Sequence, residues 1–142
     1  QADTRTDAAT TLGDIAVAAT DALPALITAS RDPHEDVRKA AAEALGIIGQ
    51  SSPEVVPALI DAVGDEHAGV RTAAVFALCR LGPHAAEAVA ALEGVLDDDN
   101  RYIRGDALHA LQRIDTPLAK DTLIKHLMPA RWCPITTPES TF

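Results

Sequence analysis

Residues 36–49, DVRKAAAEALGIIG, and residues 69–82, GVRTAAVFALCRLG, are two copies of one pattern, 33 residues apart. The same interval relates an arginine position, an aspartate position and four aliphatic positions along the chain. These are Arg5, Arg38, Arg71 and Arg104; Asp32, Asp65 and Asp98; Thr4, Val37, Val70 and Ile103; Ala8, Ala41, Ala74 and Ala107; Leu12, Leu45, Leu78 and Leu111; and Ile15, Ile48, Leu81 and Ile114. A period of this length is typical of solenoids, whose units bury their apolar faces only by stacking on one another. The sequence therefore predicts a stack of similar units.

Within one unit the apolar residues are spaced as on helices. One run, from Val37 to Ile48, places them at i, i+4, i+7, i+8 and i+11, and a shorter run, from Val56 to Val63, places them at i, i+3, i+4 and i+7. Each unit is thus two antiparallel helices, a short first helix and a longer second helix. We expect a lone second helix at about 3–15, pairs at about 21–48, 53–81 and 84–114, and a last first helix from about Pro117 to Leu127.

The predicted fold is all-α, an α-α superhelix of about four two-helix repeats over residues 1–128, followed by an extended, Pro-rich tail at 129–142. The last helix is two residues out of register with the strict period. The first helix has no partner, and a solenoid that begins in mid-repeat leaves an apolar flank bare. We therefore expect further repeats, or another domain, before Gln1.

Turn residues and capping acids recur with the period. Asp32 precedes Pro33, which suits the first position of a helix, so Asp32 is a predicted N-cap. Asp65 and Asp98 occupy the same position, and we expect the same role for them. Gly49 and Gly82 mark breaks between repeats.

Composition narrows the classes of partner. The formal net charge is −9, with twelve Lys and Arg against twenty-one Asp and Glu. A strongly acidic chain repels a phosphate backbone, so we expect no binding of nucleic acid. No run of roughly 18 uncharged apolar residues is present, so we expect no membrane span. The two cysteines, Cys79 and Cys133, lie in unlike surroundings and do not indicate a disulfide framework.

The two quoted stretches, together with VPALIDAVGD at 56–65, resemble the short HEAT-like repeat of the phycobilisome-lyase type. The resemblance covers nearly everything except the tail. It implies an α-solenoid whose second helices line a concave groove. Similar repeats occur in chromophore lyases, in scaffolds and as appendages on bacterial enzymes, so the resemblance identifies the architecture better than the function. No motif that would carry a lyase activity is matched in this sequence.

The arginine and aspartate positions admit two interpretations, an anion-binding ladder or a structural one. We favour a structural ladder, in which each arginine reaches an aspartate of its own or the neighbouring repeat. His34, His67 and Asn100 share another position among acidic residues, which could suggest a cation site. Equivalent residues of stacked helices lie roughly 10 Å apart, too far for one ion to bridge, so we predict no metal and assign these residues to solvated helix starts.

The polar face of the second helices carries the candidate binding residues. They are Lys39 and Glu43, Thr72, Phe76 and Arg80, and His109 and Arg113. Aromatic residues mixed with arginine are typical of protein interfaces, whereas a single exposed apolar residue is ordinary on any surface. We therefore regard this face as a candidate binding groove. The alternative is an ordinary solvent-exposed surface that binds no partner.

The tail holds the only tryptophan, Trp132, and ends in Phe142. Either residue could anchor the tail in a groove. Alternatively the tail covers the open end of the last repeat, over Leu123 and Leu127, and we favour this capping role because a terminal repeat must cover its bare face.

These features indicate a broad class of function but no specific partner or reaction. No phosphate loop, nucleophile elbow or Ser, His and Asp set emerges, so we predict no catalytic residue and no cofactor. The favoured hypothesis is a scaffold or interaction module that binds another protein or another domain of the same chain. The alternative is a bilin (chromophore) lyase of the HEAT-like type, and a purely structural role is a third hypothesis.

Overall fold

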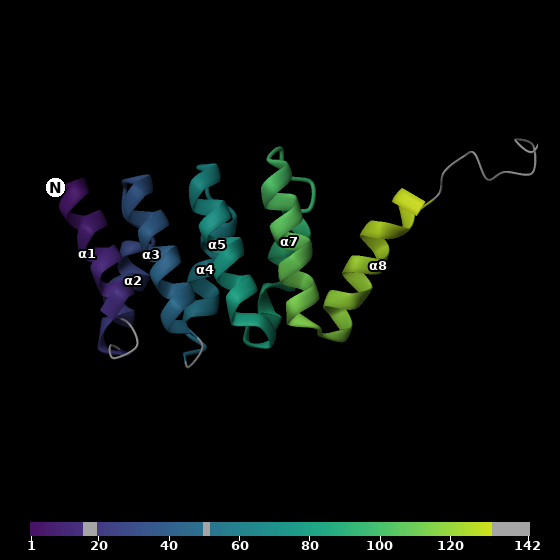
Figure 1. Cartoon of the computed structure of the whole chain (residues 1–142), viewed down its shortest axis with the longest axis horizontal. Coiled ribbons are helices and arrows are strands. Elements are labelled where there is room, and N and C mark those ends of the chain that lie inside the picture. The colour runs from purple at the N-terminus through teal and green to yellow at the C-terminus, as the bar shows by residue number, and fades with distance from the viewer. Residues whose placement is uncertain (16–19, 50–51, 132–142) are drawn as a thin grey trace, which may run out of the picture.

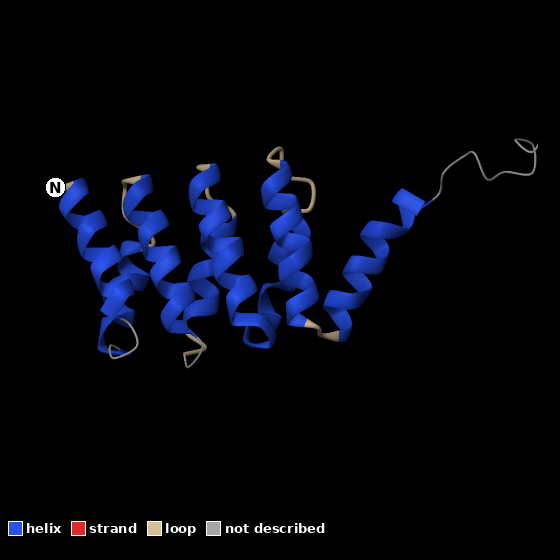
Figure 2. Cartoon of the chain, viewed as in Figure 1, coloured by secondary structure: helices blue, strands red, loops and turns tan. Residues whose placement is uncertain are grey.

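A computed structural model of the chain describes residues 1–15, 20–49 and 52–131, and every regular element in these ranges is a helix (Figure 2). The elements are α1 (Ala2–Ile15), the short 3₁₀ helix η2 (Thr20–Ala22), α2 (Leu23–Ala29), α3 (Glu35–Ile48), α4 (Val55–Val63), α5 (Ala68–Leu81), the 3₁₀ helix η4 (Gly82–Ala88), α6 (Val89–Gly94), α7 (Arg101–Ile114) and α8 (Pro117–Arg131). The prediction of an all-α solenoid is confirmed.

The helices form two layers (Figure 1). The long second helices α1, α3, α5 and α7 stand side by side in one layer, each packed on the next. The short first helices α2, α4 and α6 lie behind them. Each predicted pair corresponds to one short and one long helix, such as α4 with α5.

The repeated aliphatic positions form the interior of the stack. Leu45, Leu78 and Leu111 are fully buried, as are the alanines one turn before them in α3, α5 and α7. Burying a leucine side chain stabilises the folded state by about 1.5–3 kcal/mol relative to leaving it in water. Repetition of the same residue at the same position therefore builds one continuous core.

The two ends of the stack differ from its middle. In α1, Thr4 and Ala8 are exposed, although their counterparts in the later repeats are buried, because no short helix lies against them in the described residues. At the other end, α8 leans away from α7 (Figure 1). It also continues to Arg131, beyond the predicted boundary at 128, and includes Pro129 in its last turn.

One glycine sets the distance between α3 and α5. A Cβ atom added to Gly46 would lie 2.6 Å from the Cβ and 2.8 Å from the Cα of Ala77, closer than any real side chain approaches. The two helices therefore meet almost backbone to backbone. A second glycine, Gly82, ends α5 with φ 53°, a conformation that other residues adopt only with strain.

The segment Ala68–Gly94 is long and apolar enough to cross a membrane by length and composition alone. It is not one straight helix, because α5, η4 and α6 succeed one another there and Ala85 has non-helical backbone angles. More than half of its most apolar window is buried in the stack. The core of a helical repeat passes the same test, so this segment is weak support for a membrane span.

Candidate functional site

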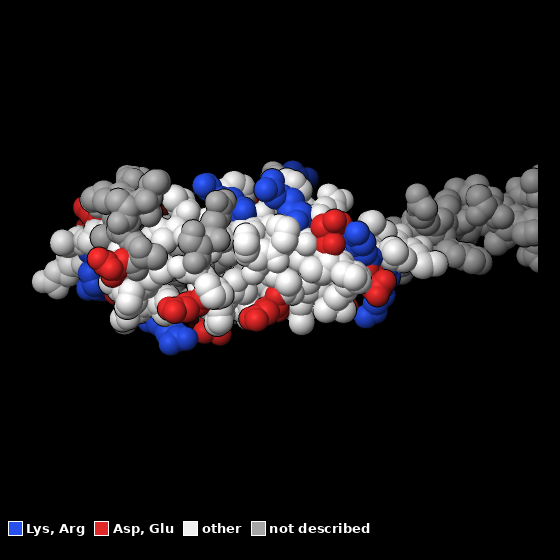
Figure 3. Space-filling model, turned by 90° about the horizontal axis from the view of Figure 1, so that it is seen from below, with Lys and Arg blue, Asp and Glu red and all other residues white. Residues whose placement is uncertain are grey.

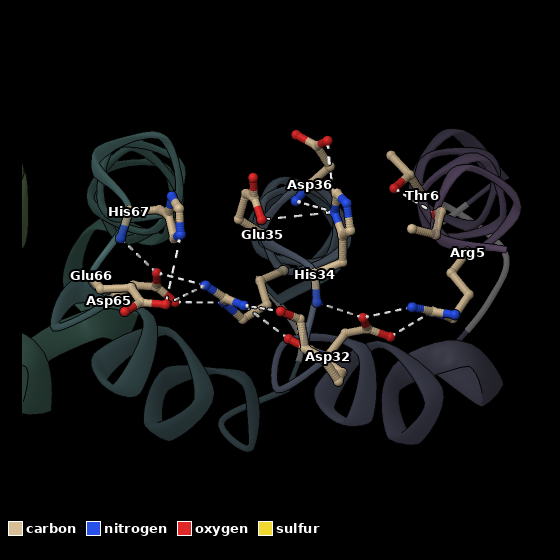
Figure 4. Close-up of polar contacts among 12 residues, drawn as sticks. Arg5, Thr6, Asp32, His34, Glu35, Asp36, Asp65, Glu66 and His67 are labelled. Carbon is tan, nitrogen blue, oxygen red and sulfur yellow. Dashed lines mark hydrogen bonds and ion pairs between the residues drawn. The ribbon is translucent and has the colours of Figure 1, made fainter.

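We define the ladder as the side chains at two repeat positions, namely Arg5, Arg38, Arg71 and Arg104 with Asp32, Asp65 and Asp98. The ladder links neighbouring repeats, and Figure 4 shows its first pair, Arg5 with Asp32. The first three arginines each donate through Nε and Nη2 to the aspartate of the following repeat. The Nε to Oδ2 distances are 2.7 Å for Arg5, 2.7 Å for Arg38 and 2.8 Å for Arg71, and the Nη2 to Oδ1 distances are 3.2, 3.0 and 3.2 Å. Such two-bond pairs fix orientation as well as charge.

The same arginines also bond to their own repeat. Nη1 of Arg38 donates to the carbonyl oxygen of Asp32 at 3.0 Å, and Nη1 of Arg71 donates to that of Asp65 at 3.0 Å. The Arg38 and Asp65 side chains are only 12% and 11% exposed, whereas Arg5, at the end of the stack, is 48% exposed. The inner pairs are therefore better shielded from water than the first.

The ladder lowers the pKa values of its carboxyl groups. For Asp98 the main cause is the hydrogen bond from Arg71, and for Asp32 it is the hydrogen bond from the backbone of His34. Burial opposes ionisation of Asp65, but the hydrogen bonds from Arg38 and the His67 backbone outweigh it and lower this pKa as well. All three aspartates are thus held in the charged form that the arginines require.

The prediction that Asp32, Asp65 and Asp98 are N-caps is wrong. The N-cap residues are His34, His67 and Asn100, two positions later. Each aspartate instead accepts a hydrogen bond from the backbone N–H of that N-cap residue, at 2.9, 2.9 and 2.8 Å. The carboxylate serves the turn and the preceding arginine together, which places it before the helix rather than at its first residue.

His34, His67 and Asn100 share the repeat position that could suggest a cation site, and two of these three side chains cap a helix instead. Asn100 Oδ1 accepts from the backbone N–H of Tyr102 at 2.9 Å, and His34 Nδ1 accepts from that of Asp36 at 3.4 Å. His67 makes no such cap bond. Within residues 1–15, 20–49 and 52–131, no group of three or more His, Cys, Asp or Glu side chains is placed to hold a metal ion.

A pocket of about 350 Å³ lies between α5 and α7 and contains four of the predicted groove residues. This α5/α7 pocket is lined by Phe76, Cys79, Arg80, Asp106, His109 and Arg113. Phe76 is 56% exposed. An aromatic ring, two guanidinium groups and an imidazole therefore share one open surface hollow.

Cys79 is one of the residues that line this pocket. It occupies the repeat position of Gly46, and its Sγ lies 3.8 Å from Nδ1 of His109. Cys79 is buried and free, and burial raises the pKa of its thiol, so it remains a neutral thiol at neutral pH. A side chain stands here between two second helices, where α3 and α5 have only the hydrogen of Gly46.

A second hollow, the α1/α3 pocket, contains the other predicted charged residues, Lys39 and Glu43. It has a volume of about 340 Å³ and is lined by Asp3, Thr6, Asp7, Thr10, Asp36, Lys39, Ala40 and Glu43. Four acids face one lysine, so this hollow is acidic. The α5/α7 pocket, with two arginines, one histidine and one acid, has the opposite character.

The layer of second helices is therefore electrostatically polarised along the stack. Figure 3, seen from below, shows a group of Lys and Arg side chains at the upper edge over the middle of the stack and several Asp and Glu side chains along the lower edge. The change of sign follows single repeat positions, for example from Thr10 and Glu43 to Phe76 and His109. Neighbouring units of one architecture thus present different chemistry.

Three predicted residues are not among those that line these pockets. Thr72 lines neither pocket, and its hydroxyl donates to the carbonyl of Ala68 at 2.9 Å. Trp132 and Phe142 lie outside the described residues, so the two interpretations of the tail stay open.

Sequence reasoning missed Cys79 and Asp106 as pocket residues, and it missed the α1 side of the acidic hollow. Thr6 and Thr10 stand one period before Lys39 and Glu43, so the same repeat positions, extended back to the first helix, would have found them. A further hollow between α6 and α8, lined by Glu93, Leu96, Asp97, Thr122, Lys125 and His126, had no signal in the period because α8 is out of register.

Comparison with protein families agrees with this geometry. Residues 1–79 and 57–131 both match the family described as HEAT repeats, which together covers the whole described stack. The chain belongs to the HEAT repeat family. HEAT repeats generally serve as scaffolds for protein interaction and are generally not catalytic. The match is to HEAT repeats as a class, so the phycobilisome-lyase type stays a prediction. A search of curated proteins found no match to the chain.

Proposed function

We propose that this HEAT repeat protein is an interaction module whose α5/α7 pocket binds an acidic segment with neighbouring apolar residues. The segment belongs to another protein or to another domain of the same polypeptide. The observation that carries the proposal is an exposed aromatic ring, Phe76, bordered by two arginines in one hollow. Aromatic and arginine side chains contribute most of the binding energy in many protein interfaces.

The two pocket arginines differ from most other arginines of the stack. Arg5, Arg31, Arg38 and Arg71 each lie within ion-pair distance of a carboxylate. Arg101 stacks over the ring of Tyr102, 4.9 Å from its centroid. Among the residues that the structure describes, no carboxylate lies within ion-pair distance of Arg80 or Arg113, so both are available to an acidic ligand.

The charge of the whole chain does not prevent this binding. At physiological ionic strength charges are screened over about 8 Å, so a short ligand in the pocket responds mainly to the cations that line it. A long polyanion would also meet the acidic remainder of a chain with net charge −9. This asymmetry favours a short acidic peptide over nucleic acid.

The acidic α1/α3 pocket lies on the same helix layer and extends the proposal. A segment that crosses the layer from α7 towards α1 would pass from a basic hollow to an acidic one. The proposed partner is thus acidic at one end and basic at the other, and this polarity fixes its direction of binding. No described residue specifically favours a bilin lyase, and we do not propose one.

Fluorescence anisotropy with designed peptides tests the proposal. Three short labelled peptides alternate leucine with glutamate, with glutamine or with lysine. We expect the glutamate peptide to bind best and to weaken as salt is added. In the double variant Arg80→Ala/Arg113→Ala its dissociation constant should rise about tenfold, and Phe76→Ala should weaken the glutamate and glutamine peptides alike.

A matched control removes the same charge elsewhere. Arg31 and Lys125 are exposed and line no part of the α5/α7 pocket, so Arg31→Ala/Lys125→Ala should leave the affinity nearly unchanged. Equal loss in both double variants would show that binding depends on net charge alone. Equal affinity for the glutamate and glutamine peptides, or no binding of any peptide, would contradict the proposal.

A further inference from the structure

The two arginines of the α5/α7 pocket occupy one repeat position on neighbouring helices. Arg80 lies in the last turn of α5 and Arg113, one period later, lies in the last turn of α7. Both are exposed and both line the pocket. Packed helices have axes about 8–10 Å apart, so two long side chains from equivalent positions can reach one group placed between them. Two guanidinium groups can therefore contact a single ligand group here.

This pair of cations is particular to one interface of the stack. The same repeat position holds Ile47 in α3, so between α3 and α5 the counterpart of Arg80 is apolar. The ladder shows what one guanidinium group requires, because Arg38 alone donates two hydrogen bonds to the carboxylate of Asp65. Two arginines in one pocket thus carry more positive charge than a single carboxylate balances.

A third donor comes from His109, which lies one turn before Arg113 in α7 and lines the same pocket. Its Nδ1 lies 3.8 Å from Sγ of Cys79. Because burial raises the pKa of the Cys79 thiol, the thiol keeps its proton at neutral pH and can donate it to Nδ1. The hydrogen of a neutral imidazole then lies on Nε2, which is left to donate to a ligand.

The remaining lining residues include one acid and one aromatic ring. Asp106 forms no ion pair with Arg80 or Arg113 in the part of the chain that the structure describes, so it leaves their charges available. Phe76 lies one turn before Arg80 in α5 and is 56% exposed. An apolar side chain next to a bound anion would therefore find a ring to pack on.

We propose that the α5/α7 pocket binds a phosphoserine of the partner segment, with the phosphoryl group between Arg80 and Arg113. This inference rests on the interaction module proposed above and names the acidic group that the module binds. A phosphoryl group carries about −1.5 to −2 charges at pH 7 and three acceptor oxygens, so it matches two arginines and a histidine better than a carboxylate does. A leucine beside the phosphoserine packs on Phe76, a contact that free phosphate lacks.

Fluorescence anisotropy on the full chain tests the inference with three labelled peptides. They share leucine and glutamine residues and differ at one central position, which is phosphoserine, glutamate or serine. We expect the phosphoserine peptide to bind about tenfold more tightly than the glutamate peptide, and the serine peptide to bind most weakly.

Substitutions show whether both arginines hold the same group. Arg80→Ala and Arg113→Ala should each remove most of the preference for phosphoserine, and the double variant should remove little more, because one phosphoryl group needs both. Asp106→Asn should tighten binding of the phosphoserine peptide, since it removes the one acid of the pocket. The control Arg31→Ala/Lys125→Ala should leave the preference unchanged.

Other results would overturn the inference. Equal affinity for the phosphoserine and glutamate peptides would contradict a phosphoserine site and leave the proposed function standing. Additive losses in the single and double variants would show that the arginines bind two separate groups. Displacement of the peptide by inorganic phosphate at concentrations near the dissociation constant of the peptide would assign the pocket to a free ion. Absence of binding by every peptide would contradict the proposed function, and this inference with it.

Discussion

The interfaces between α3 and α5 and between α5 and α7 are built from the same repeat, yet only the second forms the basic α5/α7 pocket. Both are tied by a ladder pair, Arg38 with Asp65 in one and Arg71 with Asp98 in the other. They differ where Gly46 brings one pair of helices into backbone contact and Cys79 stands between the other pair. The comparison indicates that one repeat position can decide between close contact of two helices and an open pocket while the fold is unchanged.

Acid should produce the largest change, because it acts on what the two interfaces share. The folded-state pKa values of Asp32, Asp65 and Asp98 are lowered below the ordinary value of about 3.9. Their stabilising contribution is therefore complete above that value and is lost as the pH falls through the lower folded-state values. Urea unfolding should give a constant free energy from neutral pH to about pH 5 and a steep fall below about pH 4. A midpoint that declines steadily from neutral pH would contradict this assignment.

Removal of a single inner arginine should have the next largest effect. Arg38→Gln and Arg71→Gln each leave a partly buried aspartate without its charged partner, and we expect each to lower the free energy of unfolding by about 2–3 kcal/mol. Arg5→Gln should cost less than about 1 kcal/mol, because that pair is exposed. Chemical denaturation of the three variants checks the order. Similar losses in all three would mean that shielding from water does not govern the ladder.

Substitution of glycine should then separate the two interfaces. Gly46→Ala introduces a Cβ that meets the backbone of Ala77, so α3 and α5 must move apart at a cost of about 1–3 kcal/mol. Gly105→Ala, on the exposed face of α7, meets nothing within 4 Å and should stabilise the protein by about 0.5–1 kcal/mol. Thermal unfolding should thus shift in opposite directions for the same chemical change. A stabilising Gly46→Ala would show that the seam is not closely packed.

Substitution of a residue in the α5/α7 pocket should have the smallest effect on the free energy of unfolding. Phe76 is exposed, so Phe76→Ala should change the free energy of unfolding by less than about 0.5 kcal/mol. Under the proposed function, the same variant should bind the leucine and glutamate peptide more weakly. Measurement of both quantities on one preparation distinguishes a binding residue from a structural one. A large loss of stability would place Phe76 in the packing of α5 on α7.

The period of the sequence is sufficient to predict the helices, their pairing and the shared core, since Leu45, Leu78 and Leu111 can be buried together only when the units stack. The period predicted only in part which groove residues lie together. Phe76, Arg80, His109 and Arg113 meet in one pocket, whereas Lys39 and Glu43 lie in another of opposite charge and Thr72 lies in neither. Helical angle identifies a face, but the spacing of adjacent helices decides which residues of that face share a hollow.

The amino-acid sequence by itself determined that this chain is a helical solenoid, because the repeated apolar faces are buried from water only when the two-helix units stack. Only the tertiary structure decided the positions of the aspartates two residues before the N-caps and the close seam at Gly46. The same holds for Arg104, whose Nη1 donates to the carbonyl oxygens of Asp98 and Asp99. Periodicity reports which side chains are equivalent, whereas contacts between repeats depend on distances of a few tenths of an ångström that the period does not contain.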